Sequence, residues 1–271
     1  MPSRECPNVI NYFGGKYEVS KRLIPMMPEH DKYVEVFAGG LSMFFRKGKV
    51  KSNIVNDLNK DIANLYLVLS EPLLYEEFMH RAKWLIPSRT IYDVFRKDIQ
   101  QDYKKFSIPC VARAVAYYFF IQNSFNSRVG TNFSSTSSWK KNMLSMLEWS
   151  RDKLEDVIVE NMDYRKLIPK HIKTKKKAFW YVDPPYVITD KEAYYAFNFR
   201  MEEHEVMKRI MDTIDKAGQT FMISYDDVPY IRELYKDYNV TTIDFQYQTN
   251  QKMATELVIM NYEPSTQSNL F

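Results

Sequence analysis

The feature that most constrains the fold is a series of five short apolar runs, each followed by polar or glycine residues. The runs have the length and composition of strands, and stretches with helical character separate them. Strands that alternate with helices predict an α/β doubly wound sheet, in which ligands bind beyond the carboxyl ends of the strands. The runs and the residues after them are 33–37 before Ala38-Gly39-Gly40, 53–56 before Asp57, 157–160 before Asp163, 178–182 before Asp183-Pro184-Pro185-Tyr186, and 220–224 before Tyr225-Asp226-Asp227.

Two β-rich segments near the C-terminus, 240–247 and 256–262, are separated by a polar loop. They predict an antiparallel hairpin that closes a mostly parallel sheet. The middle of the chain differs in kind, so we expect residues 1–60 and 155–271 to form the sheet domain and residues 61–154 to form an inserted, mostly helical lobe. This lobe is expected to carry helices at 72–80, 90–100 and 110–122 and a polar stretch at 123–138.

Composition excludes several classes of protein. Hydrophobic residues make up 45% and charged residues 27%, and no 18-residue apolar stretch or signal peptide is present, so we expect a soluble, intracellular protein with no membrane partner. Cys6 and Cys110 stand far apart and the four histidines lack metal-ligand spacing, so we expect no metal and no disulfide framework. The net charge of +4 is too mild to indicate a nucleic-acid partner by itself. Two basic runs, 46–51 and 171–177, fit either solvated loops or phosphate contacts.

The segment Asp183-Pro184-Pro185-Tyr186 has the chemistry to activate an amine attached to an aromatic ring. The N6 amine of adenine is a poor nucleophile because its lone pair is delocalised. Hydrogen bonds accepted by the Asp183 carboxylate and the Pro184 carbonyl would localise that lone pair, and the two prolines add no competing N–H donor. Tyr186 could stack on a base that has left the duplex. A rigid strand-to-loop turn that ends in a tyrosine explains the motif equally well.

The segment from Val34 to Ser42 predicts a nucleoside-binding turn. A strand that runs into Gly39-Gly40 and then a helix resembles the nucleotide-binding turn of Rossmann-like sheets, but no GK[ST] phosphate loop is present. A nucleoside with an amino-acid tail therefore fits better than a triphosphate. Asp57 follows the next strand, where an acidic side chain meets ribose hydroxyls. A helix N-cap is the alternative role of Asp57.

Two further segments are weaker candidates. Tyr12-Phe13-Gly14-Gly15-Lys16 combines paired glycines, which permit a close backbone approach, with a cation. Asp163 could accept a hydrogen bond from the adenine of a cofactor, and a surface turn is the competing explanation.

Taken together, these residues resemble the Dam-type family of adenine-N6 DNA methyltransferases. The matching stretches are NYFGGK, YVEVFAGGLS, VNDLNKDIANLY, ENMDY, WYVDPPY and KMATELVIMNY, in the order of that family. The resemblance implies a Rossmann-like methyltransferase sheet, S-adenosylmethionine as the cofactor, S-adenosylhomocysteine as the product and no metal. It implies that Asp183, Pro184, Pro185 and Tyr186 hold the target adenine. It implies that the cofactor site comprises Tyr12, Gly14, Gly15, Lys16, Phe37, Ala38, Gly39, Gly40, Ser42, Asp57, Asp163 and Asp183.

The chain departs from the family pattern in the inserted lobe. Members that modify GATC usually carry a hairpin similar to RYNxxGxFNVPFG, whereas this chain reads FIQNSFNSRVGTNFSSTSSW. This departure argues against GATC as the recognition sequence. The resemblance still implies double-stranded DNA as the partner, with 61–154 as the target-recognition lobe, and it allows a cognate restriction endonuclease. The candidate DNA contacts are Asn126, Arg128, Asn132 and Lys140.

Other functions remain open at this point. The same fold could methylate cytosine N4, an RNA adenine or a protein amide. Asp before Pro-Pro-Tyr favours adenine over these, and the inserted lobe favours DNA. A catalytically silent DNA-binding module is the alternative from another class, but both Asp183-Pro184-Pro185-Tyr186 and the Gly39-Gly40 turn are intact.

Overall fold

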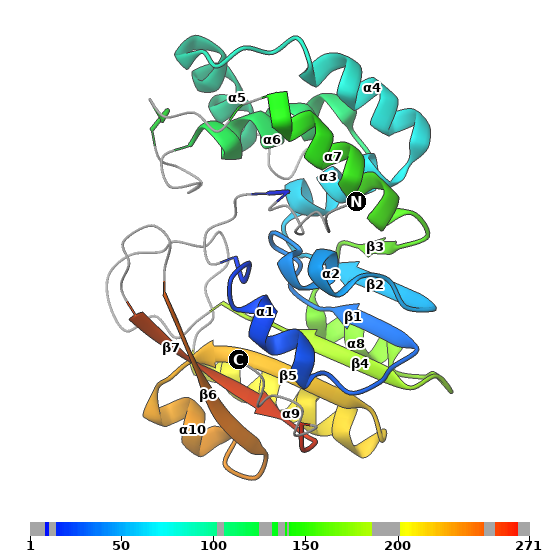
Figure 1. Cartoon of the computed structure of the whole chain (residues 1–271), viewed down its shortest axis with the longest axis vertical. Helices are drawn as coiled ribbons and strands as arrows, with labels where there is room; N and C mark the ends of the chain where they lie inside the picture. Colours follow the sequence, from blue (N-terminus) through cyan, green and yellow to red (C-terminus); the bar gives the residue numbers. More distant parts are fainter. Residues whose placement is uncertain are drawn as a thin grey trace, which may run out of the picture. The chain divides into compact units, whose positions relative to one another are not determined.

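In the computed structural model, the chain folds into two compact units (Figure 1). The first comprises residues 1–16, 38–48 and 57–161, and the second comprises 17–37, 49–56 and 162–271. The division predicted from the sequence, into a sheet domain (1–60 and 155–271) and a DNA-recognition lobe (61–154), is based on function, and it stays a prediction. The structure describes residues 9–10, 15–101, 106–124, 132–134, 139, 141–185, 201–246 and 253–264.

The second unit contains six of the seven strands of a mixed sheet, in the order β2-β1-β4-β5-β7-β6. Strands β2, β1, β4 and β5 are parallel, whereas β7 runs antiparallel to both β5 and β6. The parallel strands are in register, since Glu35 on β1 lies opposite both Val55 on β2 and Tyr181 on β4. Their carboxyl ends therefore meet at one edge. The strands are β1 (Lys32–Glu35), β2 (Ser52–Asn56), β4 (Ala178–Val182), β5 (Thr220–Asp226), β6 (Asn239–Gln246) and β7 (Met253–Met260).

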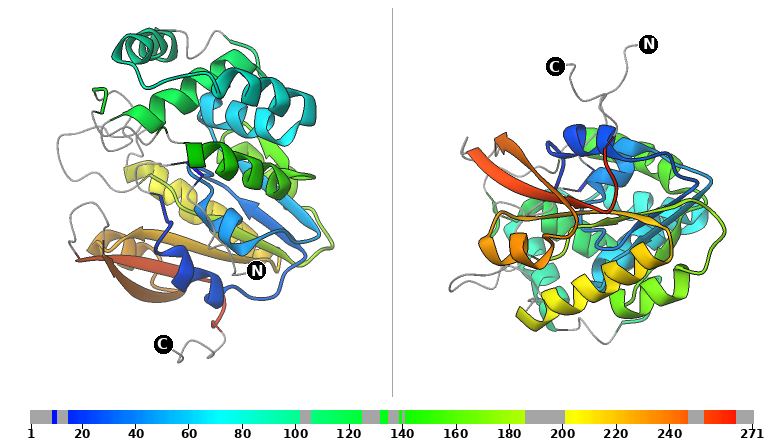
Figure 2. Two further views of the ribbon diagram at one scale, coloured as in Figure 1. Left: turned by 45° about the horizontal axis from the view of Figure 1, so that its top comes forward. Right: turned by 90° about the horizontal axis from the view of Figure 1, so that it is seen from below.

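The core of the second unit lies between the sheet and helices α8 (Tyr164–His171), α9 (Met201–Lys216) and α10 (Pro229–Leu234) (Figure 2). Strand residues two positions apart, such as Trp180 and Val182, share the face that these helices cover, because side chains alternate along a strand. Each such buried apolar side chain stabilises the fold by about 1.5–3 kcal/mol. Two short helical turns, α1 (Ser20–Leu23) and η1 (Ile24–Met26), precede β1.

The first unit is mostly helical and is built around α6 (Val111–Asn123). From Arg113 onward every residue of α6 is buried, and the helix packs against α3, α4 and α5. Aromatic rings fill these contacts, for example between Tyr92 and Phe120 and between Phe78 and Tyr118. The other elements are α2 (Ser42–Lys47), α3 (Lys60–Ser70), α4 (Pro72–Ala82), α5 (Arg89–Gln101), α7 (Lys141–Leu154) and the seventh strand, β3 (Ile158–Glu160).

The secondary structure confirms the α/β sheet, its antiparallel C-terminal hairpin and the helical middle of the chain. The expected strand at 33–37 ends at Glu35, because the chain enters the turn that carries Phe37 and Gly39. The expected strand at 220–224 continues to Asp226, because β7 pairs with it as far as Asp226 opposite Glu256. Among the residues that the structure describes, no helix is both long and apolar enough to cross a membrane.

Candidate active site

The turn before α2, in the first unit, has a backbone conformation that allows a ligand to approach the chain closely. Gly39 adopts a positive φ of 46°, where a side chain would be strained, and the N–H of Leu41 donates to the carbonyl of Ala38 at 2.7 Å. Leu41 also adopts a positive φ of 52° although its side chain is fully buried. Such a left-handed residue costs about 1–3 kcal/mol and persists only where its surroundings fix it, often at functional sites. Ser42, 8% exposed, begins α2.

The carboxylate of Asp57 supports this turn. Its Oδ2 accepts from the Gly39 N–H at 2.8 Å, and its Oδ1 accepts from the Asn59 N–H at 2.8 Å. Tyr66 on α3 donates its hydroxyl to the Gly39 carbonyl at 2.6 Å, so both backbone groups of Gly39 are held. Burial raises the pKa of Asp57 to about 6, against the opposing effect of these two N–H donors. The N-cap role considered for Asp57 is wrong, since Asn59 caps α3 by accepting from the Asp61 N–H at 3.0 Å.

In the second unit, Asp183 and Pro184 follow β4 directly, with Pro184 buried and Asp183 half-buried. Two buried tyrosines lie close enough to feel the charge of Asp183. Burial raises the pKa of Tyr181 and of Tyr225, and the Asp183 carboxylate raises both further. Tyr181 is hydrogen-bonded to Ser224 on β5 at 2.8 Å. Both phenols therefore stay neutral, and neither competes with Asp183 as a negative charge.

The second unit also contains buried, hydrogen-bonded polar side chains on β1 and β5. Tyr33 donates its hydroxyl to Glu35 at 2.8 Å, and Glu35 is only 2% exposed. Tyr225 is hydrogen-bonded to Nδ1 of His204, which lies fully buried on α9. Burial lowers the pKa of His204, so this ring is neutral near pH 7. Sequence reasoning missed Tyr181 and Tyr225 as neighbours of Asp183, although Tyr225 stands at the end of its own strand.

The turn that contains Asp163 is held beside Phe37 within the second unit. The Asn56 side chain donates to the carbonyls of Val36 at 2.9 Å and Met162 at 3.0 Å, and it accepts from the Met162 N–H at 3.0 Å. The Phe37 ring packs against Tyr164, the residue after Asp163, with centroids 5.8 Å apart. Asn56 lies in the matching stretch VNDLNKDIANLY but was not among the expected site residues, and it brings together two of the expected cofactor residues.

Asp163 itself is the N-cap of α8, rather than part of a simple surface turn. Its Oδ1 accepts from the Arg165 N–H at 2.8 Å, and its Oδ2 pairs with the Arg165 guanidinium at 2.5 Å. The hydrogen bond from the Arg165 side chain lowers the pKa of Asp163. A ligand would share this carboxylate with Arg165, and the role of Asp163 in cofactor binding stays a prediction.

Several expected site residues lie outside the described residues: Tyr12, Gly14, Asn126, Arg128, Lys140 and Tyr186. Of the N-terminal motif, Gly15 is exposed and Lys16 is buried, at 5% exposure. Pro185 is half-buried and Asn132 is exposed.

Residues 12–249 match the family described as "D12 class N6 adenine-specific DNA methyltransferase". The chain belongs to this family. Similar proteins include "Modification methylase StsI" of Streptococcus sanguinis, which is 26% identical over 95% of the chain and 43% of the relative's own length. "Type II methyltransferase M1.LlaDCHI" of Lactococcus lactis subsp. cremoris is 24% identical over 92% of the chain and 93% of that protein. "DNA adenine methylase" of Vibrio cholerae is 25% identical over 84% of both chains.

The family match confirms the resemblance inferred from the motifs. The chain is a DNA adenine N6 methyltransferase, and the alternative acceptors and the silent binding module are set aside. The chain spans less than half the length of the S. sanguinis methylase but nearly the whole length of the L. lactis enzyme.

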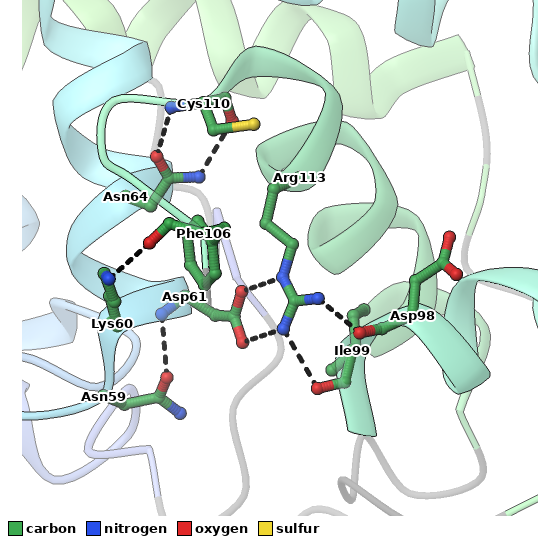
Figure 3. Close-up of polar contacts among 9 residues, drawn as sticks. All are labelled: Asn59, Lys60, Asp61, Asn64, Asp98, Ile99, Phe106, Cys110 and Arg113. Atoms are coloured by element: carbon green, nitrogen blue, oxygen red, sulfur yellow. Dashed lines mark hydrogen bonds and ion pairs between the residues drawn. The ribbon is translucent and has the colours of Figure 1, made fainter. Parts of the chain in front are cut away.

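In this D12-class methyltransferase, polar contacts join the first turns of helix α3 to α5, to α6 and to the segment before α6 (Figure 3). Asp61, in the first turn of α3, forms a bidentate pair with Arg113 of α6 at 2.6 and 3.0 Å. Arg113 also donates to the carbonyls of Asp98 and Ile99 on α5, at 2.5 and 3.0 Å. Both partners are almost fully buried, with side-chain exposures of 7% for Arg113 and 2% for Asp61.

Two other residues of α3 bind the segment that leads into α6. Asn64 accepts from the Cys110 N–H at 2.7 Å and donates to the Cys110 carbonyl at 2.9 Å. Lys60 donates to the Phe106 carbonyl, and the Phe106 ring lies 4.6 Å from the Arg113 guanidinium (Figure 3). One face of the first turns of α3 is therefore fixed to α5 and α6, while Asn59 and Tyr66 of the same helix hold Asp57 and Gly39.

Proposed function

We propose that this chain transfers the methyl group of S-adenosylmethionine to N6 of an adenine flipped out of double-stranded DNA at a specific sequence. The observation that carries the proposal is the position of Asp183 and Pro184. They stand at the carboxyl end of β4, a central strand in register with β1 and β5, where α/β sheets bind their ligands.

The residues present fit S-adenosylmethionine by their chemistry. The left-handed Gly39 leaves room for close approach of a nucleoside, and the Asp57 carboxylate beside it is an acceptor for ribose hydroxyls. In the second unit, Phe37 and Asp163 offer an aromatic ring and an acceptor to an adenine. Tyr12, Gly14, Gly15, Lys16, Ala38, Gly40, Ser42 and Asp183 complete the proposed set. The cofactor, when bound, supplies a methyl group on a sulfonium ion, which needs no covalent enzyme intermediate.

The chain's own residues activate the acceptor. The Asp183 carboxylate and the Pro184 carbonyl accept the two N6 hydrogens, which concentrates the lone pair on the nitrogen. The cofactor would supply the methyl group, and the fixed Asp183 carboxylate would stabilise the positive charge that develops on N6. One N6 proton would then pass to solvent by way of the Asp183 carboxylate. Tyr181 and Tyr225 stay protonated beside Asp183, so that carboxylate is the negative charge aimed at N6.

Target selection is assigned to the first unit. Asn126, Arg128, Asn132 and Lys140 are the proposed base and phosphate contacts, and Tyr186 is proposed to stack on the flipped adenine. The departure from the GATC hairpin leads us to propose a recognition sequence other than GATC. We further propose a restriction endonuclease that reads the same sequence as a partner; two relatives carry the names "Modification methylase StsI" and "Type II methyltransferase M1.LlaDCHI".

A transfer assay with purified protein tests the proposed chemistry. Labelled S-adenosylmethionine and unmethylated DNA are incubated with wild type, Asp183→Ala and Asp227→Ala, and the DNA is digested to nucleosides. Asp227 is the matched control, because it follows β5 and pairs with Arg232 at 2.6 Å. We expect N6-methyl-2′-deoxyadenosine from wild type and Asp227→Ala, and none from Asp183→Ala, with cofactor affinity within a few-fold of wild type. Normal transfer by Asp183→Ala would contradict the mechanism.

A further inference from the structure

The turn between α4 and α5, residues 83–88, exposes large apolar side chains. Trp84 is 74% exposed and Ile86 is 68% exposed, and Val94 on the neighbouring part of α5 is 52% exposed. Exposed side chains of this size are ordinary when they are scattered singly, so they indicate an interaction surface only together with the other features of the same segment. We call residues 83–88 the α4–α5 turn.

The same region carries a concentration of positive charge. Between residues 81 and 97 the chain has one acidic residue, Asp93, and five basic ones, although the whole chain has a net charge of only +4. Lys83 and Arg89 are exposed, and neither pairs with an acidic side chain of the described residues. The Lys83 ammonium lies over the Trp84 ring, 5.3 Å from its centroid. Exposed basic side chains interleaved with an aromatic ring are the features that bind nucleic-acid backbones and bases.

The α4–α5 turn is attached to the polar stretch expected to read DNA. Trp139 Nε1 donates to the Leu85 carbonyl of the turn at 2.8 Å. The Arg89 guanidinium lies over the Phe133 ring, 5.5 Å from its centroid. On α5, Tyr92 contacts the same Phe133 ring edge-on at 5.5 Å, and its hydroxyl is hydrogen-bonded to Ser124 at 3.0 Å. The α4–α5 turn and α5 thus contact the described residues of this stretch and Trp139, which follows it.

We infer that the α4–α5 turn is a second DNA-contacting surface of this methyltransferase, in which Lys83 and Arg89 bind phosphates and Trp84 stacks on a base beside the target. This inference rests on the proposed function, because flipping of the adenine unstacks its neighbours and leaves a base face for an aromatic ring. The partner is the double-stranded DNA around the target adenine. Such a contact adds affinity and orientation without reading the sequence.

The salt dependence of DNA binding distinguishes the phosphate contacts of Lys83 and Arg89 from the stacking contact of Trp84. Binding of the full chain to a short duplex is measured by fluorescence anisotropy between about 50 and 200 mM salt. The Lys83→Gln/Arg89→Gln double variant should make the negative slope of log K against log salt shallower by about 1.8, since each phosphate contact contributes about 0.9 to its magnitude. Trp84→Ala should weaken binding at least about fivefold and leave the slope unchanged, as expected for a lost stacking contact.

Matched controls lie elsewhere on the surface. Leu73→Ala removes a side chain that is 79% exposed at the start of the same helix α4, and Lys216→Gln removes an exposed charge at the end of α9. Both should bind DNA as wild type does. A direct readout uses Trp84 in the unmodified protein: DNA should shield its fluorescence from iodide, and the shielded signal should disappear in Trp84→Phe.

The outcomes distinguish this inference from the proposed function. If wild type methylates DNA while the double variant and Trp84→Ala bind it with wild-type affinity and slope, and iodide still quenches Trp84, the inference is overturned and the proposed function stands. If wild type does not methylate DNA at all, the proposed function fails. Self-association that requires Trp84, with DNA affinity unchanged, would assign the turn to a contact between copies and would also overturn the inference.

Discussion

At the scale of single residues, the ends of the apolar runs predicted Asp57 and Asp183, because a parallel sheet exposes the residues that follow its strands. Their partners could not be predicted in the same way. Tyr66 reaches Gly39 from 27 residues away, and Asn56 joins Met162 from 106 residues away. Such contacts depend on how helices and strands pack, and no local pattern encodes them. Asp163 was predicted as a candidate, but its bond to Arg165 could be inferred only from the helix that it caps.

The raised pKa of Asp57 predicts a pH-dependent cofactor affinity. Its folded pKa of about 6 lies above the ordinary value of 3.8, so the carboxylate becomes protonated as pH falls through about 6 and loses an acceptor for the ribose. The affinity for S-adenosylmethionine should therefore fall about tenfold between pH 7 and pH 5, in proportion to the ionised fraction. Calorimetric titration measures it. Asp57→Asn should bind weakly with a flat profile, and a wild-type affinity that does not change over this range would refute the role of Asp57.

The same shift has a consequence for stability. Because folding raises the pKa of Asp57, the folded state binds the proton more tightly, and this contribution is fully present below pH 3.8 and lost as pH rises through about 6. Its size is on the order of 1–3 kcal/mol. Near neutral pH the buried, ionised Asp57 therefore lowers the stability of the folded state. A residue retained in spite of this effect is consistent with a role in binding.

At the scale of helices and strands, sequence patterns predicted the existence of elements better than their ends. The apolar run at 178–182 is β4, and the strongly apolar segment at 110–122 is the buried helix α6. Polar residues inside the helical unit were harder to interpret. Arg113 and Asp61 interrupt apolar surfaces, and only the structure shows that they face each other, 52 residues apart.

The Arg113–Asp61 pair should dominate the stability of the helical unit. Arg113→Ala or Asp61→Ala should each lower the free energy of unfolding by about 3–5 kcal/mol, because each leaves a buried charge without its partner. The double variant should cost much less than the sum of the two. Urea unfolding monitored by circular dichroism measures all three. The exposed pair of Lys236 and Glu233 is the control, and its loss should leave the free energy of unfolding nearly unchanged because solvent screens the pair. Additive losses at Arg113 and Asp61 would show that the two side chains act independently.

At the scale of the whole molecule, the chain passes between its two units several times. Internal contacts group residues 38–48 with the helices, and the insertion of a recognition lobe at 61–154 stays a prediction. The Gly39 turn follows β1 directly along the chain. It belongs to the helical unit by its contacts, because Tyr66 and Asp57 hold it.

We propose that this chain methylates adenine N6 at a specific DNA sequence through Asp183. The most direct test is methylation sequencing of DNA from cells that express either the wild-type chain or Asp183→Asn, which keeps the shape of the side chain and removes its charge. We predict N6-methyladenine at one short motif other than GATC in the wild-type sample and at none in the variant. N6-methyladenine at the same motif in both samples would contradict the role of Asp183, and soluble wild-type protein that leaves adenine unmodified would contradict the activity itself.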